Sequence, residues 1–265
     1  MSLFPDKVST VASLRADRLA MAAAGTLPGV TLSDDFVYSK LLAAEKSIAR
    51  RLRVYLEPTY IVPDDAPQAE LDALDASGKA WAQEAAYDYS ADFFIGDRWG
   101  YLIAQSKTLV SVDSLQFVYP SAVNQVFTVP PEWIRLDRRM GQIRLVPATQ
   151  TFMAPLGAFL MQALSGGRVV PFMVQLRYTA GLKDAANQWP DLIDVIKKKA
   201  VLSLMEDAFL PQSGTISADG LSQSVSADVG KYHDMIDEAI DGGKGSNGGL
   251  MTAIHGVRMG VLGVV

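Results

Sequence analysis

Three aspartates near the middle of the chain are the side chains best placed for chemistry. Asp88 and Asp92 are four residues apart, which is helical spacing, and Asp97 follows closely. Carboxylates so placed could bind Mg²⁺ or act as an acid–base pair. The chain has no cysteine, and its two histidines are His233 and His255. This excludes thiolate metal sites and leaves little for a histidine-based triad. The sequence therefore favours a solvated acidic edge, and we predict no catalytic and no metal-binding residue.

Motifs for phosphate binding and nucleophilic hydrolysis are also missing from the sequence. Gly243-Lys244-Gly245-Ser246 has the residue types of a phosphate-binding loop, but it lacks the spacing and no predicted helix follows it. The sequence contains neither a Gly-x-Ser-x-Gly elbow nor a His-x-x-x-His pair. We therefore expect no cofactor, and we interpret residues 242–249 as a flexible hinge.

Length and composition are those of a globular protein. The chain has 265 residues, of which 49% are hydrophobic and 20% are charged. This is enough for one large domain or two modest ones with a sizeable core. No apolar run approaches the roughly 18 residues of a membrane-spanning helix, and the first residues lack a signal pattern. We expect a protein with no membrane partner that is made in a cytoplasm.

The net charge of −5 is unevenly distributed along the chain. Residues 61–100 carry two basic and nine acidic side chains, whereas residues 101–182 carry seven basic and three acidic ones. Blocks of opposite sign suit a protein whose faces meet neighbours or polyanions on some sides and repel them on others. The alternative interpretation is that the acidic block is an ordinary solvated surface.

An amphipathic helix is predicted from Phe36 to Tyr55. Ser33 precedes it as an N-cap, and Pro58 prevents its continuation. Basic side chains at steps of three and four form a stripe on its polar side, which could contact nucleic acid or an acidic partner. The alternative is that the stripe is simply the solvated face of the helix. The basic stripe consists of Lys46, Arg50, Arg51 and Arg53.

The middle of the chain changes from helical to strand-like composition. Residues 69–86 are acidic and rich in alanine, which predicts a second helix anchored by Trp81. Residues 99–182 are rich in aromatic and β-branched side chains, which predicts strands. Apolar and polar residues alternate in 133–137 and 142–146 around a glycine-containing turn, so we expect a β-hairpin there.

A further strand and two helices are predicted after the hairpin. The strand covers residues 169–178, where Pro171 argues for an edge position or a late start. A long helix with a broad apolar face begins at Pro190 and runs to Phe209. A shorter helix follows at about residues 229–240.

The final segment, residues 250–265, is strongly apolar and carries one formal side-chain charge. Such a segment must pack somewhere, because an exposed one would aggregate. It could return to its own core as an edge strand, or it could dock on another chain by adding a strand to a partner's sheet. The candidate docking residues are Leu250, Met251, Ile254, Val257, Met259, Val261 and Leu262.

The order of these elements resembles the head-to-tail connector proteins, or adaptors, of tailed bacteriophages. The resemblance lies in the basic helix, the acidic stretch, the β-rich middle ending in Tyr178-Thr179-Ala180-Gly181, and the helix opening with Trp189-Pro190-Asp191-Leu192-Ile193. It covers residues 36–57 and 174–240. Residues 99–175 form a larger β-rich insertion than small members of the family have.

The resemblance implies an α+β fold in which a helical bundle of adaptor type carries a β-rich insertion in the middle of the chain and an extended C-terminal arm. The expected boundaries are residues 1–98 for the N-terminal helical part, 99–182 for the insertion, 183–241 for the helices that complete the bundle, and 242–265 for the arm.

The resemblance further implies a homo-oligomeric ring, typically of twelve subunits, in the virion neck. Its partners would be the portal protein, which the arm would bind, and tail or neck proteins. Double-stranded DNA would pass through without specific binding, which an acidic lumen would favour. The basic stripe would then face an acidic neighbour. The lumen candidates are Asp64, Asp65, Glu70, Asp72, Asp88 and Asp92, with the acidic helix at 228–241 as an alternative.

Two other functions remain open at this point. One is a neck or tail-completion protein that caps the tail tube. The other is a metal-dependent enzyme that processes nucleic acid with Asp88, Asp92 and Asp97. We expect a structural protein and not an enzyme.

Overall fold

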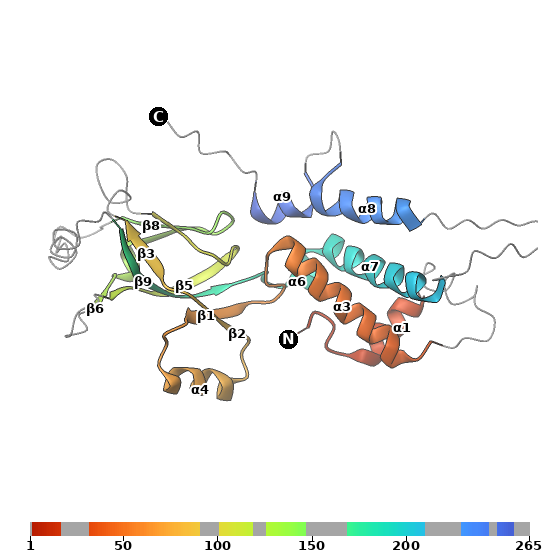
Figure 1. Cartoon of the computed structure of the whole chain (residues 1–265), viewed down its shortest axis with the longest axis horizontal. Coiled ribbons are helices and arrows are strands. Elements are labelled where there is room, and N and C mark those ends of the chain that lie inside the picture. The colour runs from red at the N-terminus through yellow and green to blue at the C-terminus, as the bar shows by residue number, and fades with distance from the viewer. Residues whose placement is uncertain are drawn as a thin grey trace, which may run out of the picture. The chain divides into compact units, whose positions relative to one another are not determined.

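The computed structural model describes residues 2–16, 32–90, 101–118, 126–146, 169–209, 229–243 and 248–256. The chain divides into two compact units (Figure 1). The helical unit combines Met1–Leu52 with Asp184–Val265, and the β unit is Arg53–Lys183. The fold is α+β with the sheets in the middle of the chain, as predicted. The β unit begins at Arg53, earlier than the insertion expected from residue 99, because residues 59–90 contribute strands to the main sheet.

The helical unit is built around two long helices that lie far apart in the sequence. It contains α1 (Lys7–Ala16), α3 (Asp34–Leu52), α6 (Ala185–Gln188), α7 (Pro190–Phe209), α8 (Val229–Asp241) and α9 (Leu250–His255). Helices α3 and α7 pack against each other, and Leu41, Leu52 and Ile196 on them are completely buried. Helices α3, α7 and α8 confirm the predicted helices, whereas the sequence pattern does not predict α1.

Helix α3 begins where expected and ends earlier than expected. The backbone N–H of Phe36 donates to the Ser33 hydroxyl at 3.3 Å, which is the predicted N-cap. The helix ends at Leu52 because Arg53 adopts a left-handed conformation with φ of 52°. Pro58 therefore does not set the end of this helix.

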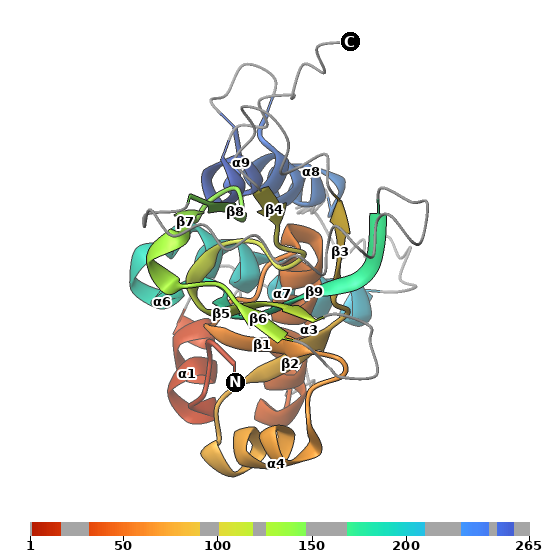
Figure 2. The same cartoon turned by 90° about the vertical axis from the view of Figure 1, so that its left-hand side faces the viewer.

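The β unit consists of two sheets (Figure 2). Its elements are β1 (Thr59–Pro63), α4 (Gln68–Ser77), β2 (Trp81–Glu84), β3 (Tyr87–Ser90), β4 (Tyr101–Ile103), β5 (Leu109–Val118), β6 (Val126–Thr128), the 3₁₀ turn η2 (Pro131–Trp133), β7 (Ile134–Asp137), β8 (Gln142–Leu145) and β9 (Val169–Ala180). The larger sheet has the order β2-β1-β9-β5-β6, and β3 also pairs with β9. The smaller sheet has the order β4-β8-β7. Strands β7 and β8 confirm the predicted hairpin.

Strand β9 is the centre of the larger sheet, so the predicted edge position is wrong. It pairs with β1, β3 and β5, all antiparallel. Pro171 is tolerated because it lies in a bulge, where the register with β3 shifts and Phe172 has φ of 53°. The Asp88 carboxylate accepts a hydrogen bond from the Phe172 N–H at 3.1 Å and so satisfies the bulged backbone.

The predicted acidic helix over residues 69–86 is wrong in its second half. Helix α4 ends at Ser77 because Gly78 adopts a left-handed conformation with φ of 65°. Trp81 lies in strand β2, which pairs in parallel with β1, and its indole N–H donates to the Asp75 carboxylate at 2.8 Å. Residues 59–84 thus form a strand–helix–strand unit, with α4 lying beyond β1 and β2 in both views (Figures 1 and 2).

Candidate functional site

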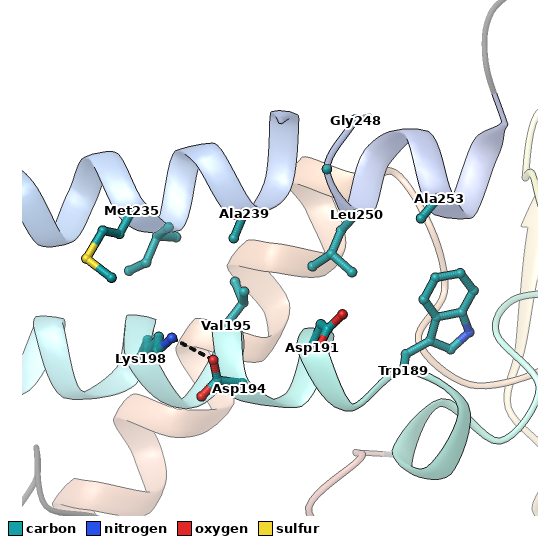
Figure 3. Close-up of a pocket in the computed structure, with 12 residues that line it drawn as sticks. Trp189, Asp191, Asp194, Val195, Lys198, Met235, Ala239, Gly248, Leu250 and Ala253 are labelled. Carbon is teal, nitrogen blue, oxygen red and sulfur yellow. Dashed lines mark ion pairs between the residues drawn. The ribbon is translucent and has the colours of Figure 1, made fainter. Parts of the chain in front are cut away.

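The helical unit carries a groove of about 360 Å³ between α7, α8 and α9 (Figure 3). Apolar side chains dominate its inner surface: Val195, Ile236 and Leu250 are all buried. Met235 stands at one end and is 53% exposed, and Trp189 stands at the other end beside Ala253 (Figure 3). The groove is lined by Trp189, Asp191, Asp194, Val195, Lys198, Met235, Ile236, Ala239, Gly248, Gly249, Leu250 and Ala253.

The rim of the groove on α7 is charged. Lys198 and Asp194 form an ion pair of 2.7 Å one helical turn apart. Asp191 is exposed and has no ion-pair partner within the described parts of the chain. The groove therefore combines apolar side chains with one carboxylate, Asp191, that lies in the first turn of α7 and has no ion-pair partner within the described residues. Such a surface suits an apolar segment that carries a single positive charge.

Glycines allow α8 and α9 to meet beside the groove. A Cβ atom on Gly249 would lie 2.5 Å from the backbone nitrogen of Gly242 and 2.5 Å from the carbonyl oxygen of Ile240. Any side chain would therefore collide with backbone, and Gly242 also needs φ of 89°. Residues 242–249 are predicted to form a flexible hinge. At both ends of this stretch the glycines allow close backbone packing, and residues 244–247 lie outside the described residues.

The first part of the predicted C-terminal arm is a packed helix. Residues 250–255 form α9, in which Leu250 is 6% and Ile254 is 2% exposed. These two side chains pack within the helical unit and so do not project from an extended arm, whereas the sequence analysis places them among the docking residues. Met251 is half-buried on the same helix. The remaining candidates, Val257, Met259, Val261 and Leu262, lie outside the described residues.

His255 fastens α9 to the end of α3. Its Nε2 lies 2.6 Å from the carbonyl oxygen of Leu52. A carbonyl can only accept, so Nε2 carries the proton. Nδ1 is buried and has no hydrogen-bond partner within the described residues.

The predicted basic stripe is divided between an internal ion pair and the solvent. Arg51 pairs with Asp237 and, at 2.5 Å, with Asp241, so it holds α8 against α3. Lys46 and Arg50 are exposed, and Arg50 Nε donates to the Lys46 carbonyl at 3.3 Å. Arg53 is also exposed, but it lies in the β unit.

A second contact fastens α8 at its other end. His233 Nε2 lies 2.6 Å from the Glu206 carboxylate on α7. Helix α8 is thus held by Arg51 near its last turn and by Glu206 near its first turn. These contacts keep the walls of the groove in place.

The described members of the predicted lumen set differ in their surroundings. Glu70 makes two hydrogen bonds with Arg177, at 2.8 and 2.9 Å, and the pKa of Glu70 is lowered because the guanidinium donates to it. Asp65 accepts from Gln175 at 2.6 Å, and Asp72 accepts from Gln68 at 2.8 Å. Asp64 is exposed. The described residues hold no group of three His, Asp or Glu side chains that could bind a metal ion.

Of the three carboxylates considered for catalysis, Asp88 is the one that the structure describes. Asp88 lies in strand β3 and not in a helix, so the four-residue spacing to Asp92 is not a helical spacing at Asp88. Asp92 and Asp97 lie outside the described residues.

No helix in the described part of the chain is long and apolar enough to cross a membrane.

No protein-family model matches the chain, nor does any curated protein. The chain is similar to a chain from the neck of an empty gene transfer agent particle, computed with C6 symmetry, with 17% identity, a TM-score of 0.35, and coverage of 78% of this chain and 84% of that one. It is also similar to a chain from the virion of a native gene transfer agent particle, with 16% identity, a TM-score of 0.34 and the same coverage. TM-scores this low do not establish a shared fold, so neither likeness says what this chain does.

A half-buried carboxylate in the β unit escapes prediction from the sequence. Glu84 in β2 accepts hydrogen bonds from the Tyr87 hydroxyl at 2.5 Å and from the Tyr178 hydroxyl at 2.7 Å. The two hydroxyls in turn accept from the backbone N–H groups of Gln105 and Ser106. Burial raises the pKa of Glu84, and burial also raises the pKa values of both tyrosines.

This carboxylate network joins three strands of the larger sheet and has a structural role. Tyr178 stands in the tyrosine-containing strand on which the family resemblance rests, whereas the sequence pattern places Glu84 in a helix. Because residues 81–84 form a strand and not a helix, Glu84 lies beside Tyr178.

Proposed function

We propose that the protein is a structural component of a tailed, phage-like particle that forms a ring in the neck between the portal and the tail. Double-stranded DNA would pass through the channel of this ring without specific binding. The proposal is supported by the sequence resemblance to head-to-tail connector proteins and by the way that the resembling segments fold.

One observation carries the proposal. Residues 36–52 and 190–209 are the segments with the connector-like pattern, and they pack together as α3 and α7 although the whole β unit separates them in the sequence. The insertion is a compact unit with its own core. A connector-type helical unit can therefore carry this β unit without being interrupted by it.

The distribution of charge supports a channel that repels DNA, with a revised set of residues. Glu70 is compensated by Arg177, and Asp237 by Arg51, so neither presents a free charge. Asp64 and Asp72 in the β unit are exposed carboxylates. Like charge in the lumen would keep DNA mobile, because cationic contacts would hold it in a salt-dependent way. We propose that exposed carboxylates of this kind line the channel.

Docking on neighbours would involve the remaining basic and apolar residues. Lys46 and Arg50 would face an acidic neighbour, since both are free of carboxylate partners within the described residues. Residues 257–265 would dock on a neighbouring chain in the neck, and the family resemblance implies the portal protein as a partner of the ring. The ring would contain about twelve subunits, as is typical of the family, and would have no enzymatic activity.

Electron microscopy of particle necks tests this function. We expect the chain's density in a ring between the portal and the tail, and DNA-filled heads without tails when the chain is deleted. A cap on free tail tubes that is absent from heads would instead identify a tail-completion protein. Metal-dependent cleavage of nucleic acid that disappears in Asp92→Asn would contradict the structural role altogether.

A further inference from the structure

We infer that the groove between α7, α8 and α9 receives residues 257–265 of a second copy of the same chain. The inference rests on the proposed function in one respect, because it names the neighbour that this segment binds within the ring. It assigns the groove to contacts between subunits and leaves other surfaces for the portal and the tail.

The chemistry of the groove matches that of the segment. Met235, Ala239 and Ala253 are the exposed apolar side chains along the groove, and Asp191 places an exposed carboxylate on its rim. Residues 257–265 are apolar or glycine except for Arg258, which is their one charged side chain. Apolar side chains of the segment would fill the interior while Arg258 meets Asp191. Lys198 would not repel Arg258 strongly, because Asp194 already pairs with it.

The length of the segment is sufficient. The groove follows α7 from Trp189 to Lys198, a distance of about 14 Å at the rise of an α-helix. Nine extended residues span at most about 30 Å. The segment can therefore cover the groove and still have residues left to cross from one subunit to the next.

The direction of α9 favours a second copy over the same chain. Helix α9 runs from Gly248 beside the middle of the groove toward Ala253 at the Trp189 end (Figure 3). Gly256 ends the helix there, and its N–H donates to the Thr252 carbonyl at 2.8 Å. The chain therefore leaves α9 at the outer end of the groove and directed away from it, so a segment that enters from another copy needs no reversal of direction. A groove and a segment that fit each other but sit on separate copies form a head-to-tail contact, which closes into a ring when the rotation permits.

Disulfide trapping tests the inference cleanly because the chain has no cysteine. One chain carries Ala239→Cys, in the groove, and another carries Val261→Cys, in the segment. Each chain has a single thiol, so a mixed disulfide can form only between copies. The control replaces Ala239→Cys with Asp234→Cys, which is exposed on α8 outside the groove lining. Both mixtures are oxidised as concentrated purified protein and as assembled particles.

We expect at least about tenfold more mixed disulfide with the cysteine at 239 than with that at 234, since a seated segment holds the two thiols together. The double variant Ala239→Cys/Val261→Cys should give linked chains of two or more copies. A monomeric internal disulfide in that variant would show that the segment occupies its own groove and would overturn the inference. Equal trapping at 239 and 234 in both preparations would also overturn it.

A charge exchange supplies a second measurement. Arg258→Asp should lower the trapping about three- to fivefold, and Asp191→Arg on the receiving chain should restore it. Failure of the exchange to restore trapping would contradict the assigned orientation. These outcomes can be distinguished from a failure of the proposed function. If the protein forms a ring in the neck but gives no mixed disulfide above the control, only this inference is contradicted. If the mixed disulfide forms but the protein is absent from necks, only the proposed function is contradicted.

Discussion

One charged cluster from each unit differs in how far it is exposed to solvent. In the helical unit, Arg51 reaches Asp237 and Asp241 at the surface, where all three side chains are between 37% and 57% exposed. In the β unit, Glu84 is half-buried and accepts hydrogen bonds from buried hydroxyls such as that of Tyr178. Exposed ion pairs contribute about 0–1 kcal/mol and weaken in salt, whereas unpairing a buried polar group costs about 1–3 kcal/mol. The Arg51 contacts of the helical unit should therefore respond to salt, and the Glu84 network of the β unit should respond to pH.

The largest effect is expected in the β unit, from Gly181→Ala after β9. A Cβ there would lie 2.3 Å from the Glu57 carbonyl oxygen, and the residue has φ of 124°. The backbone must move, so we expect the β unit to lose about 3 kcal/mol of unfolding free energy. Hydrogen exchange followed peptide by peptide should show the loss in residues 53–183. The comparison of the two units would fail if the helices lost as much protection as the strands.

A glycine without crowding provides the control for that substitution. Gly78 also has positive φ, 65°, but no atom lies within 4 Å of the position that a Cβ would take there. Gly78→Ala should therefore lower the unfolding free energy by only about 1–2 kcal/mol, which is the cost of the left-handed backbone alone. Equal losses at both positions would show that contact with Glu57 is unimportant.

The next effect concerns the hydroxyl of Tyr178. Tyr178→Phe removes a donor to Glu84 and leaves the Ser106 N–H without its acceptor. We expect a loss of about 2 kcal/mol, measured by urea unfolding. Tyr55→Phe, at an exposed tyrosine of the same unit, should change the unfolding free energy by less than about 0.5 kcal/mol. A loss in Tyr178→Phe no larger than this would mean that the network contributes little.

A smaller effect is a change in the pH dependence of the β unit. Burial raises the pKa of Glu84 in the folded state, so the folded unit binds more protons than the unfolded one as pH rises from the unfolded pKa to the raised one. The stabilisation is complete below the unfolded pKa and is lost as pH rises through the folded pKa. Glu84→Gln should abolish this loss, as measured by urea unfolding at a series of pH values.

Glu70→Gln is the matched control, because the pKa of Glu70 shifts in the opposite direction. Arg177 lowers it, so the stabilisation from Glu70 is present above its unfolded pKa and is lost as pH falls through the folded pKa. Glu70→Gln should remove the loss at low pH and leave the Glu84 dependence intact. If both variants changed the same side of the profile, the assignment of the two carboxylates would be wrong.

Local patterns predict the parts of the fold that are set by local forces. Helix α3 follows from its apolar period and the Ser33 cap, and β7–β8 from strict alternation around Gly141. Helix α7 similarly follows from Pro190 and its apolar face. These elements bury one face or stripe each, and that leaves a clear periodic pattern in the sequence.

The remaining features depend on contacts between distant residues. Pro171 suggests an edge strand, because proline has no N–H to donate to a neighbouring strand. In the structure a bulge interrupts the pairing at this point, and the Asp88 carboxylate accepts the hydrogen bond of the Phe172 N–H. Gly242 and Gly249 look like a hinge, although they are glycines because two backbones touch. Most of the groove residues are individually ordinary positions on three helices. Sequence alone therefore could not locate the candidate site, although it did identify the apolar segment that we assign to it.

The smallest effect belongs to the exposed ion pairs of the helical unit, and it completes the comparison. Arg51→Gln should cost about 0.5–1 kcal/mol at low salt, because Arg51 meets two carboxylates but stays solvated. Added salt should shrink the difference from the unmodified chain, since ions screen exposed charges. Arg50→Gln removes a neighbouring exposed charge that donates only to the Lys46 carbonyl, so it should change little at any salt concentration. Exchange protection of α8 is the measurement, because α8 is the helix that Arg51 holds. A cost that persists in high salt would show that this contact resembles the half-buried Glu84 network of the β unit more than a surface pair.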